Sequence, residues 1–351
     1  MALLKGIRVL EVGRLLPSSL CAQLLADLGA EVIKVEEPGV GDYMRVLPLF
    51  QALARGKRSV TLNLRRAEGR RLLYMLAARS HVLVESFRPK AARRLGLGPS
   101  KLRRVNRRLI YCSITGYGKK GEHAPLPSHD INCAGLAGLL PGEGYEPLLP
   151  LLIADIAAGL AAALYICAAL ASRSRGLYID VSMADAALPF SLYRLTQALA
   201  GSREELLNGR YAYYRLYRSR EGKPVSVAAL EPEFQEALKE ALGLSDEKPE
   251  ALAEALASRE LRELLRLARQ RDLPLQEVLE PEQLPGHAYY RRRGSLSVRQ
   301  GVPYFSLALL DGRPQVNEGR PCALGEHTEQ VLLELGVRRE ELAALRRRGV
   351  I

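Results

Sequence analysis

Residues 7–35 read IRVLEVGRLLPSSLCAQLLADLGAEVIKV, and this stretch decides the fold. The apolar run Ile7–Val12 predicts a short strand. A helix is then expected from Pro17, a residue that favours the first turn of a helix, to Leu28, where a glycine follows. Glu31–Val35 predicts a second strand. A strand, a helix and a strand in this order form the repeating unit of a parallel sheet.

The same alternation continues along the chain. Val82–Val84 and Leu109–Ile114 predict two further strands. Strands that alternate with helices indicate a parallel sheet covered on both faces. Ligands of such sheets bind beyond the carboxyl ends of the strands, so the glycine-containing loops after Val12 and Ile114 are expected there. The sequence has no GxGxxG, and therefore lacks the signature of a dinucleotide-binding fold.

The composition changes near Gly201. Residues 211–230 predict an antiparallel hairpin that turns at Glu221-Gly222, and two charged helices are expected after it, over Glu233–Leu242 and Pro249–Gln270. We therefore expect an α/β protein with two domains. A large Rossmann-like parallel-sheet domain is assigned to residues 1–200 and 305–351, and a smaller α+β domain to residues 205–300.

Composition and charge narrow the function classes. The 351 residues are 48% hydrophobic and 26% charged, which is typical of a globular protein. Lys and Arg outnumber Asp and Glu by 51 to 39, so the net charge of +12 indicates either an anionic partner or a merely solvated basic surface. The sequence shows no recognised nucleic-acid-binding module, and no nucleic-acid partner is expected.

The five cysteines are scattered without a CxxC pair, which favours reduced, buried thiols in a cytoplasmic protein and predicts no metal centre. The first residues, MALLKGIRVLEV, do not resemble a signal peptide. Leu148–Ala171 is apolar enough to span a bilayer, but Pro150 and Asp155 interrupt it. Its alanine and glycine content favours a helix packed inside protein, so no membrane partner is expected.

Asp155 is the only charged residue between Glu146 and Arg173. Apolar surroundings raise the pKa of a carboxyl group towards the range in which it transfers protons. His129 stands 26 positions earlier, and together the two groups suit proton transfer at neutral pH. A structural histidine, and a helix-capping or paired aspartate, are the alternative interpretations.

Cationic residues gather in the first domain. Arg55-Gly56-Lys57-Arg58-Ser59 places charge beside a glycine in a loop before a strand, an arrangement that suits phosphate groups. Arg88 directly follows a strand and is expected at the ligand edge of the sheet. A solvated surface is the alternative interpretation of these charges.

In several segments the sequence resembles the family III CoA-transferase superfamily of the CaiB/BaiF type. The matching segments, in order, are residues 5–12, 23–36, 55–59, 87–89, 95–97, 111–118, 155–159, 180–185 and 324–327. Ser128-His129-Asp130-Ile131-Asn132 is similar to the GHDIN-type motif of α-methylacyl-CoA racemases, and Glu231-Pro232-Glu233-Phe234 is similar to a racemase segment that supplies a glutamate.

The resemblance implies a racemase that interconverts (R)- and (S)-2-methylacyl-CoA thioesters through an enolate. His129 and Asp155 would be its acid/base residues, and Glu231 their supporting partner. It further implies a homodimer of interlocked rings and no cofactor, because CoA enters as part of the substrate. The expected contacts to CoA are Lys57, Arg58, Leu62, Arg88, Gly116 and Tyr117.

Two departures keep rival functions open. Leu151 stands where racemases carry an asparagine four positions before the aspartate, and the smaller domain is abbreviated between about residues 245 and 285. In a CoA-transferase, Asp155 would instead attack the thioester carbonyl and form a mixed anhydride. A non-catalytic acyl-CoA binder is the third possibility.

Overall fold

The computed structural model describes residues 2–140, 151–172, 176–202, 207–244 and 248–351. The chain divides into two compact units. The large unit comprises residues 1–192 and 288–351, and the small unit comprises residues 193–287.

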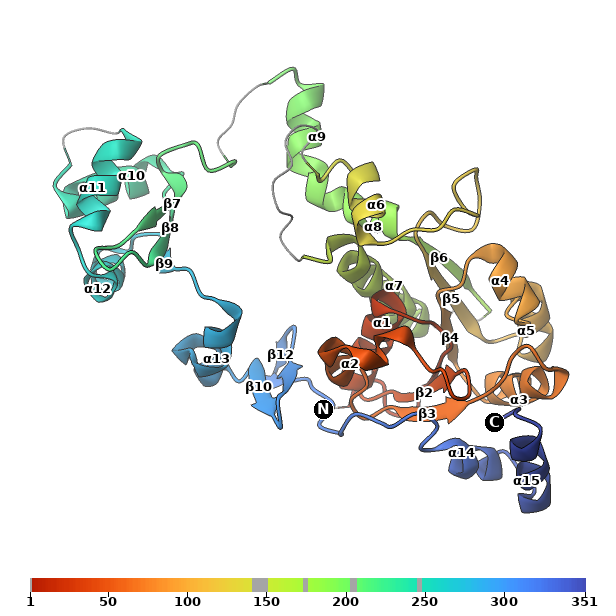
Figure 1. Cartoon of the computed structure of the whole chain (residues 1–351). Helices are drawn as coiled ribbons and strands as arrows, with labels where there is room; N and C mark the ends of the chain where they lie inside the picture. The colour runs from red at the N-terminus through yellow and green to blue at the C-terminus, as the bar shows by residue number, and fades with distance from the viewer. Residues whose placement is uncertain (1, 141–150, 173–175, 203–206, 245–247) are drawn as a thin grey trace. The chain divides into compact units, whose positions relative to one another are not determined.

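The large unit is built on a six-stranded parallel sheet (Figure 1), which confirms the expected α/β fold. The strand order is β3-β2-β1-β4-β5-β6, so the direction of strand addition reverses between β1 and β4. The strands are β1 (Arg8–Glu11), β2 (Glu31–Glu36), β3 (Arg58–Thr61), β4 (Val82–Glu85), β5 (Ile110–Thr115) and β6 (Tyr178–Ser182).

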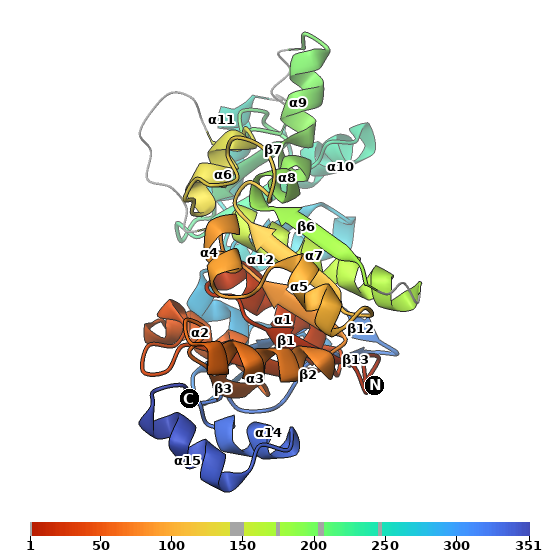
Figure 2. The same cartoon turned by 90° about the vertical axis from the view of Figure 1, so that its right-hand side faces the viewer.

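Helices lie on both faces of this sheet (Figure 2). In chain order, those before β6 are α1 (Leu16–Asp27), α2 (Pro48–Leu53), α3 (Ala67–Ala78), α4 (Pro89–Arg94), α5 (Pro99–Val105), α6 (Asp130–Leu136) and α7 (Ile153–Ala171), with the 3₁₀ helix η1 (Tyr43–Val46) after β2. The helices after β6 are α8 (Met183–Ala187), η2 (Leu188–Ser191) and α9 (Leu192–Leu199), which runs into the small unit.

Alternate residues of the four central strands, β2, β1, β4 and β5, enter two separate cores, as the two-residue period of a strand requires. In β1, Val9 packs with α1 and α7 on one face, whereas Leu10 packs with α3 on the other. Gly159 lets α7 lie against α1, because a Cβ there would be 3.0 Å from the carbonyl oxygen of Pro17. Among the described residues, α7 is also the one helix long and apolar enough to cross a membrane.

Residues 288–351 return to the large unit. They form α13 (Ala288–Arg293), β10 (Leu296–Arg299), β11 (Val302–Phe305), β12 (Leu309–Leu310), β13 (Arg313–Pro314), α14 (Thr328–Glu334) and α15 (Arg339–Arg347). Leu332, Leu345 and Val350 are fully buried in the same core as Leu10. The carbonyl oxygen of Val350 accepts a 2.7 Å hydrogen bond from the N–H of Asn63, just after β3.

The small unit has a core of its own around a three-stranded antiparallel sheet. Its strands are β7 (Tyr214–Arg218), β8 (Pro224–Ala228) and β9 (Leu275–Glu277), and its helices are α10 (Pro232–Leu242), α11 (Pro249–Ala257), α12 (Leu261–Arg271) and η3 (Pro281–Gly286). The hairpin expected at 211–230 is confirmed, with its turn between β7 and β8.

The single helix expected over Pro249–Gln270 is wrong, because two helices, α11 and α12, occupy this stretch. The hairpin turn supplies the reason. The N–H of Arg220 donates to the carbonyl oxygen of Arg259, and the Glu221 carboxylate accepts a hydrogen bond from the N–H of Leu261. These bonds satisfy backbone groups at the break between the two helices.

Candidate active site

A pocket of about 440 Å³ lies at the carboxyl ends of β1, β2, β3 and β4. The reversal between β1 and β4 falls within this group of strands, and such a switch point is where open α/β sheets bind ligands. The pocket is lined by residues that follow each of the four strands, among them Leu15, Asp42, Leu62 and Arg88. Two expected contacts, Leu62 and Arg88, are therefore in this pocket.

Four arginines line the pocket: Arg14, Arg65, Arg88 and Arg94. Arg14 and Arg65 both pair with Glu37, at 2.8 and 3.1 Å, whereas Arg88 donates to the carbonyl oxygen of Pro125 at 3.2 Å. Arg94 is exposed and makes no ion pair with any residue that the structure describes. The pocket therefore presents cations suited to a polyanionic ligand.

Lys57 and Arg58, expected as contacts to CoA, do not line this pocket. The Lys57 side chain has no exposed surface, and its ammonium lies 2.7 Å from the carboxylate of Glu11. Arg58 pairs instead with Glu31 and Glu334, at 2.8 and 2.7 Å. The structure thus gives both cations carboxylate partners and presents neither to the pocket.

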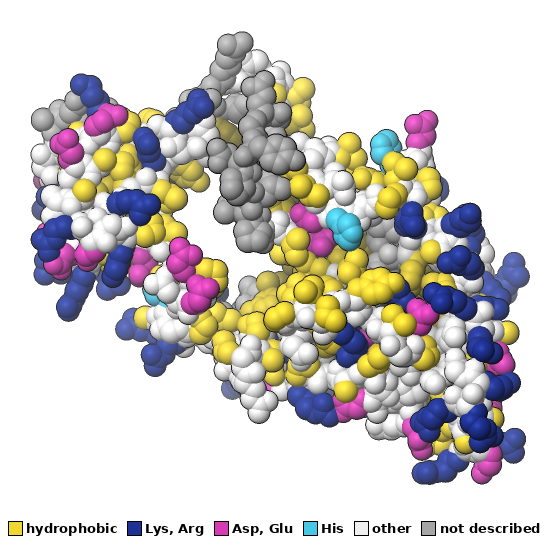
Figure 3. Space-filling model, in the orientation of Figure 1, with side chains coloured by type: hydrophobic (Ala, Val, Ile, Leu, Met, Phe, Trp, Pro, Cys, Tyr) yellow, Lys and Arg dark blue, Asp and Glu magenta, His cyan; other side chains and the backbone are white. Residues whose placement is uncertain are grey.

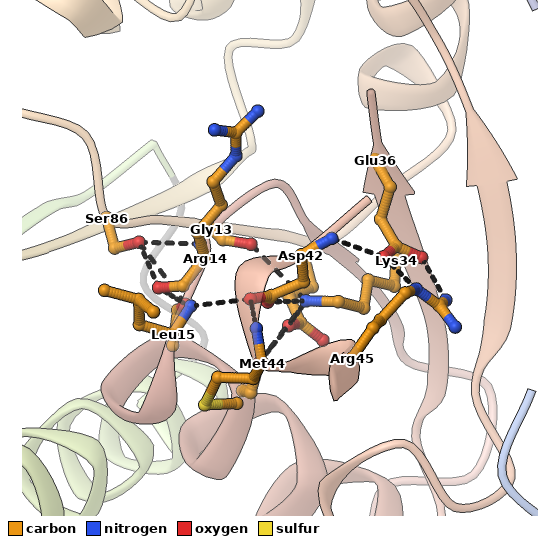
Figure 4. Close-up of polar contacts among 12 residues, drawn as sticks. Gly13, Arg14, Leu15, Lys34, Glu36, Asp42, Met44, Arg45 and Ser86 are labelled. Atoms are coloured by element: carbon orange, nitrogen blue, oxygen red, sulfur yellow. Dashed lines mark hydrogen bonds and ion pairs between the residues drawn. The ribbon is translucent and has the colours of Figure 1, made fainter. Parts of the chain in front are cut away.

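Beneath the pocket, the side chains of Glu11, Lys34 and Lys57 form a fully buried ionic cluster. Burial alone would raise the pKa of Glu11, but the two ammonium groups reverse this and lower it. Burial and the positive charge of Lys34 lower the pKa of Lys57 despite its pairing with Glu11. Lys34 also reaches Asp42 at 2.9 Å, which joins the cluster to the pocket wall (Figure 4).

The turn from β1 into α1 forms part of this wall. Leu15 has φ 67° and ψ −173°, a backbone conformation that residues other than glycine rarely adopt. The Asp42 carboxylate accepts a hydrogen bond from the N–H of Leu15 at 3.2 Å, and the Ser86 hydroxyl bonds to the backbone of Arg14 (Figure 4). None of these residues stands out in the sequence, because only a backbone angle reveals the strain.

The residues expected to move protons lie at the starts of α6 and α7. His129 is exposed and immediately precedes α6. Asp155 is in the first turn of α7. The carboxylate of Asp130 accepts a 2.9 Å hydrogen bond from the backbone N–H of Asp155, so the residue next to His129 ties the two helix starts together.

The environment of Asp155 raises the pKa of its carboxyl group. Burial, and to a smaller degree the negative charge of Asp130, raises the pKa of Asp155 from 3.8 to about 7. Both the acid and the carboxylate forms are therefore populated at neutral pH, so the group can either donate or accept a proton. Asp130 directly follows His129 in the motif Ser128–Asn132, but its contact with Asp155 could not be inferred from the sequence.

Gly116 and Tyr117 follow β5 and lie beside the His129 loop rather than in the pocket. A Cβ at Gly116 would be 1.8 Å from the hydroxyl oxygen of Ser128, so only glycine allows this approach. The Tyr117 ring packs edge-on against His123, with 5.6 Å between the ring centroids. These contacts join the carboxyl end of β5 to the loop that carries His129.

Glu231 belongs to the small unit, where it is exposed immediately before α10. It is therefore not among the residues that the large unit brings together. Within the described parts of the chain, no group of three or more His, Cys, Asp or Glu residues is placed to hold a metal ion.

The sequence model of CoA-transferase family III matches residues 4–328. The chain belongs to this family. It is 36% identical to the alpha-methylacyl-CoA racemase of Homo sapiens, covering 97% of this chain and 96% of that protein. It is 28% identical to an acyl-CoA transferase of Fusarium pseudograminearum, covering 99% and 88%. A CAIB/BAIF family protein from Brucella suis has a similar structure, with a TM-score of 0.83 and 28% identity over 95% of this chain and 99% of that chain.

Proposed function

We propose that this family III protein is a racemase of 2-methylacyl-CoA thioesters. The observation that carries the proposal is the junction of α6 and α7, where Asp130 bonds to the backbone of Asp155 next to His129. This junction combines an exposed imidazole with a carboxyl group whose pKa is raised to about 7. Similarity to racemases over nearly the whole chain supports the same assignment.

The proposed chemistry uses these two groups as alternating acid and base. A thioester acidifies its α-hydrogen because the resulting carbanion is delocalised into the carbonyl as an enolate. His129 or Asp155 removes this proton from one face of the α-carbon, and the other residue returns a proton to the opposite face. The backbone N–H groups that precede Asp155 at the start of α7 stabilise the enolate oxygen, a contribution of about 3 kcal/mol per donor, whereas the Asp155 N–H donates to Asp130.

The CoA portion is assigned to the pocket at the ends of β1–β4. Its phosphates carry negative charge, and the exposed guanidinium groups of Arg88 and Arg94 supply the complementary charge. The acyl thioester then extends towards the ends of β4 and β5, where Gly116 meets the His129 loop. This assignment replaces Lys57 and Arg58 as phosphate contacts, because neither lines the pocket and both pair with carboxylates outside it.

Solvent deuterium tests the chemistry directly. The protein is incubated with one enantiomer of a 2-methylacyl-CoA in deuterated water, with no free acid present. Deuterium is expected to enter the α-position while optical activity is lost, and His129→Ala and Asp155→Asn are each expected to slow both at least 100-fold. His81→Ala, which changes an exposed histidine immediately before β4, and Asp185→Asn, in the first turn of α8, are the controls.

A CoA-transferase gives a different result in the same assay. This chain is 31% identical to the succinyl-CoA:glutarate CoA-transferase of Mus musculus, covering 66% of this chain. A separate experiment with an added carboxylic acid therefore tests for CoA transfer. Exchange of CoA that requires an added carboxylic acid, without deuterium at the α-carbon, would refute the racemase proposal. Trapping of an Asp155 acyl group with hydroxylamine would assign the residue as a nucleophile instead.

We further propose that the protein works as a homodimer. Helix α7 exposes the apolar side chains of Ile156, Leu160, Leu164 and Tyr165, and hydrophobic side chains gather on this face of the large unit (Figure 3). Exposed apolar surface of this kind is typical of a subunit interface. Light scattering after size exclusion is expected to give twice the chain mass, and Leu164→Glu is expected to shift the protein towards monomer. A stable wild-type monomer would contradict the proposal.

A further inference from the structure

The strained turn at Gly13–Leu15 is held in place by two side chains from other strands. The Ser86 hydroxyl, just after β4, accepts a hydrogen bond from the Arg14 N–H at 2.8 Å and donates one to the Arg14 carbonyl oxygen at 2.9 Å. Asp42, after β2, accepts the N–H of Leu15 at 3.2 Å. An unfavourable backbone conformation persists only when its surroundings enforce it, and these bonds do so here.

Asp42 is fixed on its other side as well. One carboxylate oxygen also accepts the N–H of Met44 at 3.0 Å, and the other accepts a hydrogen bond from the Lys34 ammonium at 2.9 Å. The side chain is almost fully buried. Burial would raise the pKa of Asp42, but Lys34 and the two backbone N–H groups lower it below its ordinary value. Asp42 is therefore ionised at neutral pH.

The turn carries Arg14 to a specific place in the pocket. The Arg14 guanidinium lies over the rings of Tyr43 and Phe87, 4.8 and 5.8 Å from their centroids. It donates to the Tyr43 hydroxyl and to the Glu37 carboxylate, each at 2.8 Å. A cation in contact with two aromatic rings, at the wall of a pocket with further arginines, is an arrangement that suits a nucleotide.

We propose that Asp42 is a positioning residue for acyl-CoA, which holds Leu15 in its strained conformation so that Arg14 faces the bound nucleotide. The identity of the ligand rests on the function proposed above. Without the Asp42 carboxylate, Leu15 relaxes to an ordinary backbone conformation and Arg14 leaves its place. The ligand must then restore the turn at the expense of its own binding energy. The alternative is that Asp42 serves only the stability of the fold, through its ion pair with Lys34.

Binding of free CoA, measured by titration calorimetry, tests this proposal. Asp42→Ala is expected to raise the Kd of CoA about tenfold, which corresponds to about 1.4 kcal/mol. The KM for acyl-CoA is expected to rise by a similar factor, while kcat stays within about twofold because the His129 loop is unchanged. Leu15→Gly added to Asp42→Ala is expected to recover most of the affinity, since glycine adopts positive φ freely.

Ser86→Ala tests the same turn through its second support, and keeps the proposal testable if Asp42→Ala does not fold. It is expected to raise the Kd about threefold, again with recovery by Leu15→Gly. The matched control is Asp27→Ala. The Asp27 side chain is also largely buried, pairs with Arg55 at 3.3 Å and accepts a backbone N–H, but it does not line the pocket. Its loss is expected to lower the melting temperature without changing the Kd of CoA.

Two results would overturn the inference. Asp42→Ala and Ser86→Ala could bind CoA as tightly as the wild type, or Leu15→Gly could fail to recover the affinity that they lose. The second result would assign the effect of Asp42 to its ion pair with Lys34. Failure of the wild type to bind CoA would instead overturn the proposed function, and the inference with it.

Discussion

Replacing Asp155 with asparagine is expected to change how the stability of the protein depends on pH. The folded state raises the pKa of this carboxyl group from 3.8 to about 7. The folded state therefore binds the proton more tightly than the unfolded state, and stability falls as pH rises from the unfolded to the folded pKa. Each pKa unit corresponds to about 1.4 kcal/mol. Compared with a group that stays neutral, the Asp155 carboxyl group therefore lowers the free energy of unfolding by about 2 kcal/mol at pH 5.5 and by about 4 kcal/mol at pH 8.5.

The measurement is urea unfolding of the wild type and of Asp155→Asn at several pH values between about 5.5 and 8.5. The free energy of unfolding of the variant minus that of the wild type is expected to rise by about 2 kcal/mol from the lowest to the highest pH. Other titrating groups contribute equally to both proteins and cancel in this difference. Asp185→Asn, which changes an exposed carboxylate in the first turn of α8, is expected to give a flat difference. A flat difference for Asp155→Asn as well would refute the raised pKa and the proton-transfer role built on it.

Three further outcomes are expected. Glu11→Gln leaves the buried Lys57 ammonium without its carboxylate and leaves Lys34 with Asp42 alone, and is expected to lower the free energy of unfolding by about 3–5 kcal/mol; a loss below about 1 kcal/mol would contradict the buried pairing. Asp130→Asn removes a charge that raises the pKa of Asp155, so the pH profile of α-proton exchange is expected to move to lower pH, and an unmoved profile would count against that coupling. Arg94→Ala is expected to weaken CoA binding about tenfold while Arg104→Ala, outside the pocket, does not, and equal losses would refute the placement of CoA.

The sheet could be predicted from local patterns because its strands are short apolar runs bounded by glycine and charge. The strand that begins the fold was expected at Ile7–Val12 and is observed at Arg8–Glu11. A packed apolar helix was also expected within Leu148–Ala171, and α7 is observed at Ile153–Ala171. The break between α11 and α12 could not be foreseen, because the backbone groups that it exposes are satisfied by a hairpin turn about 40 residues earlier.

The candidate site shows the same division. Arg88 could be placed at the pocket because it directly follows a strand. The ion pairs of Lys57 and Arg58 could not be predicted, because their partners Glu11 and Glu334 are 46 and 276 positions away in the sequence. Charge in a loop before a strand looks alike whether it faces a ligand or a buried glutamate. The identity of the partner decides between the two, and only the three-dimensional fold brings that partner near.

The burial of Leu345 and Val350 against the sheet has a consequence for biosynthesis. On one face of the sheet, the core in which Leu10 packs with α3 is not completed on the ribosome until Leu345 and Val350 have been translated, more than 330 residues after Leu10. The small unit, by contrast, emerges whole and with its own core before that happens. During translation, the small unit can therefore fold while the large unit still lacks part of its core, and chaperones are expected to bind the apolar surface of the large unit.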